Sequence, residues 1–246
     1  MFYKEMGDGF PLVLIHGFPL DHSIWNECMI SLSKKFRVIA PDLHGFGKST
    51  DTPANSSMAG MAHSIQTLLI RMGIEQVALC GHSMGGYSAL SFAEQFPASL
   101  RNLILISSHI FSDSEEIKKS RFSTMEVITK VGAKNALANM PGKLSDQPKT
   151  QQFCMNLLQK IKDRSATISL KAMAERRDAI SVWKELEDRA MVLAGDSDNF
   201  LPIGTIREME AINPLSSVKI FEGVGHLPML DIPNIVSAEI IEIFKE

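Results

Sequence analysis

Hydrophobic and polar positions along the chain follow two alternating patterns. Short, continuous apolar runs are typical of strands covered on both faces, and they lie at 11–16, 36–40, 76–80, 102–107, 190–194 and 217–221, with a shorter edge strand at 2–5. Segments whose apolar residues recur every three or four positions predict amphipathic helices, and they lie at 24–32, 57–72, 86–95, 202–212 and 232–244. Because runs and helical segments alternate, the sequence predicts an α/β protein, with a mostly parallel sheet and helices on both faces.

The segment from 111 to 187 interrupts this alternation. It contains no convincing strand, and its apolar spacing predicts helices at 115–131, 133–140, around 153–161 and at 165–176. Trp183 closes the segment. We therefore expect a helical cap at 111–187, inserted between two strands of a core that is formed by 1–110 and 188–246.

Gly81-His82-Ser83-Met84-Gly85 joins a buried strand to a helix through a tight turn. A serine at the apex of such a turn is typical of a nucleophile elbow. The glycines two positions before and two positions after Ser83 remove side chains that would collide with the crowded backbone. The helix that follows directs its amide N–H groups toward negative charge that forms beside the hydroxyl. The motif predicts a nucleophilic serine.

A serine hydroxyl needs an adjacent base, and the base needs a group that fixes its tautomer. Ligands of parallel sheets bind outside the carboxyl ends of the strands, so both partners are sought in loops that follow strands. The run at 190–194 is followed by Asp196 and Asp198, and the run at 217–221 is followed by His226. The order serine, acid, histidine is that of one hydrolase fold, with either aspartate as the acid.

Five segments in this order resemble the α/β-hydrolase fold superfamily, in the serine hydrolase branch that carries a helical cap. They are His16-Gly17-Phe18-Pro19, Pro41–Ser49, Gly81–Gly86, Gly195–Pro202 and Gly223–His226. Family members usually have one more strand before the first strand here, so the resemblance leaves the strand count open.

The resemblance implies a role for each matching residue. Ser83 would be the nucleophile and His226 the base. Asp198 would be the acid, since the family pattern reads Gly-x-x-Asp with a proline a few residues on, and Asp196 is its rival. The backbone N–H groups of Phe18 and Met84 would form the oxyanion hole.

The implied activity is hydrolysis of a small, fairly apolar carboxylic ester or lactone through an acyl-enzyme. Hydrolysis of a carbon–carbon bond and formation of a peracid use the same triad and remain alternatives, as does a non-catalytic ligand sensor on this fold. Dehalogenase and epoxide-hydrolase relatives carry an aspartate at the position of Ser83, which argues against those activities. His109, Met125 and Met140 are expected to line the substrate pocket.

Three other residues near these motifs are expected to be structural. His16 would hold loop backbone by a hydrogen bond rather than act in catalysis. His82 would pack beside Ser83 or support another residue of the site. Asp42 would stabilise the turn of the loop at 41–50.

The charge and cysteine content of the chain limit the partners and the compartment that can be expected. The formal net charge is −3 and the basic residues are scattered, which argues against binding to nucleic acid or to an anionic membrane, and the pair Arg176-Arg177 is interpreted as a solvated helix face. Cys28, Cys80 and Cys154 are far apart and predict free thiols in a reducing compartment. With no apolar leader and no window long enough to span a membrane, we expect a cytoplasmic protein.

The expected partner is a small-molecule substrate, and the oligomeric state stays open. Neither a His-Glu-x-x-His nor a Cys-x-x-Cys pattern occurs, so the sequence predicts no metal. No cofactor is predicted either.

Overall fold

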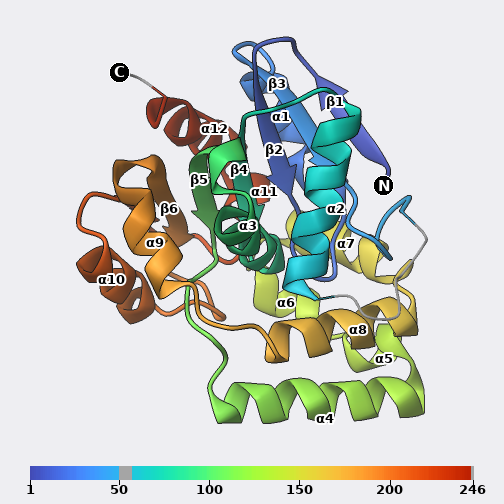
Figure 1. Cartoon of the computed structure of the whole chain (residues 1–246). Coiled ribbons are helices and arrows are strands. Elements are labelled where there is room, and N and C mark those ends of the chain that lie inside the picture. The colour runs from blue at the N-terminus through green and yellow to red at the C-terminus, as the bar shows by residue number, and fades with distance from the viewer. Residues whose placement is uncertain (50–56, 245–246) are drawn as a thin grey trace.

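The computed structural model describes residues 1–49 and 57–244, so the end of the predicted loop at 41–50 lies outside the described residues. Figure 1 shows a sheet above a set of helices. The strands are β1 (Tyr3–Met6), β2 (Phe10–Ile15), β3 (Phe36–Pro41), β4 (Val77–His82), β5 (Leu100–Ile106), β6 (Ala190–Gly195) and β7 (Ser217–Phe221). Their order is β1-β3-β2-β4-β5-β6-β7, and only the pairing of β1 with β3 is antiparallel. The predicted fold class is confirmed.

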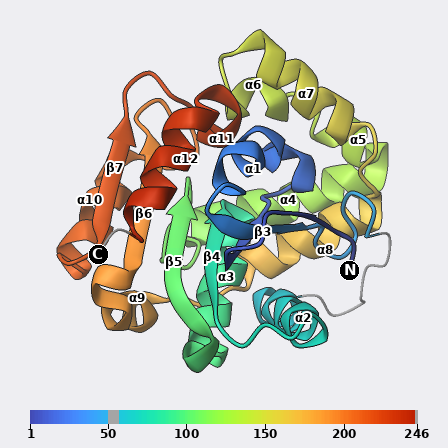
Figure 2. The same ribbon diagram turned by 90° about the horizontal axis from the view of Figure 1, so that it is seen from above.

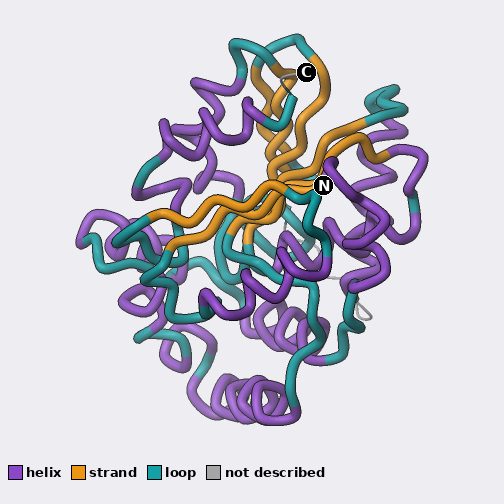
Figure 3. The backbone as a smooth tube through the Cα atoms, turned by 90° about the vertical axis from the view of Figure 1, so that its left-hand side faces the viewer, coloured by secondary structure: helices purple, strands orange, loops and turns teal. Residues whose placement is uncertain are grey.

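The central strands are mostly apolar because helices cover both faces of the sheet. Every residue of β4 and of β6 is buried. One face is covered by α2 (Met58–Arg71), α3 (Met84–Gln95), α9 (Ile180–Leu186) and α10 (Ile203–Ile212), and the other by α1 (Asn26–Leu32), α11 (Pro228–Asp231) and α12 (Pro233–Glu242) (Figure 2). Figure 3 shows the strands fanning out as the sheet twists between these two layers.

Parallel register brings the functional loops to one edge of the sheet. Ile15, the last residue of β2, pairs with Gly81 of β4, and His82 pairs with Ile106 at the end of β5. The loops that follow these strands therefore begin at the same level. The parallel pairings of β5 with β6 and of β6 with β7 continue this edge to the loops that carry Asp198 and His226.

The chain between β5 and β6 forms only helices. They are α4 (Glu115–Val131), α5 (Ala133–Ala136), α6 (Met140–Leu144), α7 (Pro148–Leu158), α8 (Asp163–Ala174), α9 and a short 3-10 turn at Glu187–Arg189. In Figure 1, α4, α5 and α8 lie below the sheet, and α4 packs against α8. None of the described helices is long and apolar enough to cross a membrane.

The helices of this segment differ from the prediction in two places. The single helix expected at 133–140 is instead α5 followed by α6, which begins at Met140 with Pro141 in its first turn, where proline favours a new helix start. At the other end, α9 packs against α3, and the Trp183 indole N–H donates to the Met209 carbonyl over 3.0 Å. Residues 180–187 therefore lie beside the sheet, not below it. A cap at 111–187 stays a prediction.

Candidate active site

Ser83 occupies the sharp turn between β4 and α3. Its φ is +50° and its ψ is −118°, a conformation that non-glycine residues seldom adopt. The turn needs glycine on both sides, because a Cβ on Gly81 would lie 2.6 Å from the Gly86 Cα and one on Gly85 would lie 2.4 Å from the Ile15 carbonyl oxygen. The Ser83 N–H donates to the Ile106 carbonyl over 3.0 Å, which ties the turn to β5.

His226 and Asp198 form a buried pair from two different loops. The His226 Nδ1 lies 2.7 Å from the Asp198 Oδ2. The other carboxylate oxygen of Asp198 accepts the N–H groups of Phe200 at 2.8 Å and Leu201 at 3.2 Å. Both oxygens of Asp198 therefore have partners, and the contact at Nδ1 leaves the Nε2 atom of His226 available for proton transfer.

Asp196 has a different role in the same loop. It is exposed, and its Oδ1 accepts the Gly223 N–H at 2.7 Å and the Ser197 hydroxyl at 2.9 Å. The bond from Gly223 joins the loop after β6 to the loop after β7. The geometry thus favours Asp198 over Asp196 as the acid that holds His226.

The loop after β2 places Phe18 beside Ser83. His16 is fully buried; its Nδ1 donates to the Gly17 carbonyl over 2.9 Å, and its Nε2 accepts the Leu43 N–H over 3.0 Å. This matches the structural role expected for His16. Met84 is the first residue of α3, so its N–H has no acceptor within that helix. Phe18 and Ser83 line the same cavity.

His82 connects the elbow to the loop that carries His226. Its Nε2 donates to the His226 carbonyl over 2.9 Å, and the two rings lie 4.9 Å apart. Burial, and to a smaller extent the neighbouring His226, lower the pKa of His82 well below its usual value, so the ring stays neutral. His82 is thus a supporting contact for the backbone of His226.

We expect His82→Leu to lower kcat by about tenfold with little change in KM, because His226 loses a buried hydrogen bond that fixes its position. His82→Gln is the matched control, since its amide nitrogen can replace Nε2, and it should retain most of the activity. Steady-state kinetics of both purified variants measure the effect. Equal losses in both variants would show that this hydrogen bond does not position His226.

A cavity of about 300 Å³ contains Ser83 and His226 together. It is lined by Ser83 and His226, by apolar Phe18, Ile117, Met140, Met173, Phe200 and Leu201, and by polar Tyr87, Ser107, His109, Asp113, Arg121 and Asn199. Among the predicted pocket residues, His109 and Met140 line it. Met125 does not, because it lies about 12 Å along α4 from Ile117 and packs against the hydrophobic core.

The polar side of this cavity includes side chains that the sequence interpretation missed. Asp113, in the loop after β5, binds Arg121 of α4 and Arg176, which follows α8. The Arg176 Nη1 lies 2.6 Å from the Asp113 Oδ1, and its side chain is buried. The interpretation of Arg176 as solvated was therefore wrong, whereas Arg177 is exposed. Asp113 and Arg176 are 63 positions apart in the sequence, so no local pattern predicts the pair.

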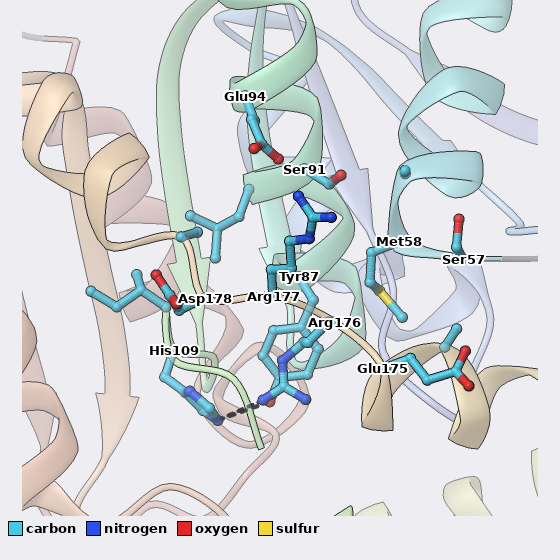
Figure 4. Close-up of a pocket in the computed structure, with 15 residues that line it drawn as sticks. Ser57, Met58, Tyr87, Ser91, Glu94, His109, Glu175, Arg176, Arg177 and Asp178 are labelled. Carbon is cyan, nitrogen blue, oxygen red and sulfur yellow. Dashed lines mark hydrogen bonds between the residues drawn. The ribbon is translucent and has the colours of Figure 1, made fainter. Parts of the chain in front are cut away.

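Tyr87, His109 and Arg176 line a second cavity, of about 320 Å³ (Figure 4). The Arg176 guanidinium lies 3.8 Å from the centre of the Tyr87 ring, and the Tyr87 hydroxyl lies 3.1 Å from the His109 Nε2. Tyr87 and His109 also line the cavity that contains Ser83, so the two cavities share these side chains. Burial and, second, the positive charge of Arg176 lower the pKa of His109 to about 4.

This pKa predicts a contribution of His109 to acid sensitivity. The unfolded chain binds the His109 proton below its ordinary pKa of 6.5 while the folded protein resists it down to about 4, so stability is lost as the pH falls through that window. When the pH is lowered from about 7.5 to about 5, the unfolding free energy of His109→Gln should fall by about 2 kcal/mol less than that of the unmodified protein. Urea denaturation at both pH values measures this, and equal losses would contradict the assignment.

Asp42 stabilises its loop as predicted. It is fully buried and accepts the His22 N–H at 2.8 Å, the His22 Nδ1 at 2.7 Å and the Lys48 N–H at 2.8 Å. Asp21, His22 and Asp42 are also the described residues whose side-chain atoms are close enough together to bind a metal ion. The hydrogen bonds of Asp42 to His22 and Lys48 already explain why these side chains lie close together.

Residues 11–233 match the family described as alpha/beta hydrolase fold. This chain belongs to that family. An uncharacterised protein of Mycobacterium tuberculosis is 28% identical to it, over 94% of this chain and 74% of the relative. A soluble epoxide hydrolase of Corynebacterium is 38% identical over 93 residues, which cover 38% of this chain and 32% of that protein.

Among solved structures, a thermophilic esterase from Thermogutta terrifontis, with malate bound, is 30% identical and has a TM-score of 0.89. The match covers 98% of this chain and 91% of the esterase. The predicted superfamily is confirmed, and the esterase and hydrolase relatives support a hydrolase.

Proposed function

We propose that this protein is a serine hydrolase that cleaves a small carboxylic ester or lactone. One observation carries the proposal: Ser83 at the elbow and His226, paired with Asp198, line a single cavity. A serine, a histidine base and an acid that holds the histidine are the groups that acyl transfer requires. The similarity to an esterase over nearly the whole chain supports this chemistry.

The proposed reaction begins when the Nε2 of His226 takes the proton from the Ser83 hydroxyl. The Ser83 oxygen attacks the carbonyl carbon, and the Asp198 carboxylate stabilises the imidazolium that forms. The oxyanion is stabilised by the backbone N–H groups of Phe18 and Met84, each worth about 3 kcal/mol in the transition state. His226 then protonates the leaving group, and water repeats the sequence on the acyl-enzyme.

Helices α4 to α8 act as the cap in this proposal. Ile117 and Arg121 of α4, Met140 of α6 and Met173 of α8 line the cavity. They limit its size to about 300 Å³, which is at the lower end of the range for small-molecule pockets. The helices therefore favour small substrates.

A panel of p-nitrophenyl esters and lactones of increasing acyl length tests the proposal. Short esters should turn over repeatedly, and kcat/KM should fall as the acyl chain outgrows the cavity. Preference for long chains would overturn the size argument. A single slow turnover, or none, with every member of the panel would instead favour the ligand sensor.

A further inference from the structure

Two guanidinium groups surround one buried carboxylate beside the catalytic cavity. The Arg176 Nη1 and the Arg121 Nη2 lie 2.6 and 3.3 Å from the Asp113 Oδ1, and the Arg121 Nε binds the Oδ2. Burial alone would raise the pKa of Asp113, but the hydrogen bonds and charges of both arginines outweigh it and hold that pKa below its usual value. Asp113 is therefore a carboxylate with both oxygens occupied.

The cluster has one positive charge in excess. Burial raises the pKa of Tyr87, and burial with the charge of Arg176 lowers the pKa of His109 to about 4, so both neighbours are neutral near pH 7. Two arginines and one aspartate remain, so the cluster itself carries a net charge of +1; the carboxylate of Asp198, which also acts on Tyr87, is bound to His226. A buried excess charge is costly unless an opposite charge accompanies it.

Arg121 is the arginine that a ligand can reach. Its side chain is 20% exposed, against 4% for Arg176, and it lines the cavity that contains Ser83. A guanidinium has five N–H donors. Three are used within the described part of the chain, one of them on the Met173 sulfur at 3.4 Å, which is a weak acceptor.

An adjoining cavity of about 390 Å³ extends the positive region. It shares Phe18, Ile117, Arg121, Met140 and Phe200 with the catalytic cavity. Its charged lining residues are Arg121 and Lys143, with no aspartate or glutamate among its described lining residues. Ile117 and Phe200 are 45% and 44% exposed. An apolar surface with two cations thus borders the cavity that contains Ser83.

From this arrangement we infer that the substrate carries a carboxylate, which binds Arg121 while the ester or lactone carbonyl is held at Ser83. Arginine matches a carboxylate with two parallel N–H donors, and Lys143 adds a point charge that attracts the anion. This inference rests on the proposed function and narrows its substrate class. The apolar character that the sequence predicts for the substrate would then describe only one end of the substrate molecule.

The test compares monoethyl glutarate with ethyl hexanoate, which have similar lengths and the same leaving group. The unmodified protein should have the higher kcat/KM for the anionic ester. In Arg121→Met, Asp113 keeps Arg176 as its partner, and the anionic-to-neutral ratio of kcat/KM should fall about 10- to 100-fold, mainly through KM. Lys143→Gln should lower the ratio less and weaken its dependence on salt.

Arg207→Met is the matched control, because it removes one cation from an exposed pair with Glu210, and the ratio should not change. A ratio that is the same in Arg121→Met, or a preference for the neutral ester in the unmodified protein, would overturn the inference and leave the proposed function intact.

Calorimetry with glutarate gives an independent readout. Glutarate should bind to Ser83→Ala, and binding should weaken at least about tenfold when Arg121→Met is added. Absence of binding would contradict the inference even if no ester is cleaved. Absence of turnover with Arg121-dependent glutarate binding would overturn the serine hydrolase proposal and support the anionic site.

Discussion

Replacing Ser83 with alanine should reduce kcat for ester hydrolysis by at least about 10⁴-fold. The variant removes the only atom that forms the proposed acyl-enzyme, and the remaining groups cannot substitute for it. Alanine should fit the turn as well as serine does, because the close backbone contacts of the turn are made at Gly81 and Gly85. Initial rates with the best ester of the panel, measured at high enzyme concentration, give the size of the loss.

Ser64→Ala is the matched control for this variant. Ser64 lies on α2, where its hydroxyl donates to the Gly60 carbonyl, and its loss should leave the rates unchanged. Thermal unfolding should show that both variants remain folded. If Ser83→Ala keeps more than about one per cent of the activity, the assignment of the nucleophile is wrong.

Asparagine at position 198 should lower kcat/KM by about 10³- to 10⁴-fold. The nitrogen of the asparagine amide cannot accept a hydrogen bond from the His226 Nδ1–H, so the tautomer of His226 is no longer fixed. The amide also carries no charge, so it does not stabilise the imidazolium form of His226. Asp196→Asn should change kcat/KM by less than about threefold, because the Asp196 side chain is exposed and accepts hydrogen bonds from Ser197 and Gly223. Parallel kinetics of the two variants compare the carboxylates directly.

The two aspartates are matched controls for each other, since they lie two residues apart in the same loop and undergo the same chemical change. Equal and small losses would contradict a triad that includes Asp198. A large loss at Asp196 alone would make Asp196 the acid, against the 2.7 Å contact between Asp198 and His226.

The parts of the fold that the sequence predicted correctly depend on local patterns. Strands such as β4 and β6 are apolar at consecutive positions because both of their faces are covered, so their positions are visible in the sequence. The turn at Ser83 is equally local, because its glycines are required by contacts with the strand and helix on either side. The proposed site residues come from this frame, since parallel strands end at one edge, and their catalytic roles stay predictions.

The parts that the sequence did not predict depend on contacts between distant segments. Arg176 looks solvated beside Arg177, and only the fold brings Asp113 to it. Met125 continues the helical spacing of Ile117 and Arg121, but α4 extends beyond the cavity before it reaches Met125. Helical periodicity predicts which residues share one face of a helix, but it does not predict which part of the protein packs against that face.

Covalent labelling with a fluorophosphonate tests the central claim most directly. Intact-mass and peptide analysis should find one label per chain, on Ser83, with loss of hydrolysis in proportion to labelling. Ser64→Ala should label as the unmodified protein does, and Ser83→Ala should not label. A folded protein that does not react, or that carries the label on another residue, would contradict the account.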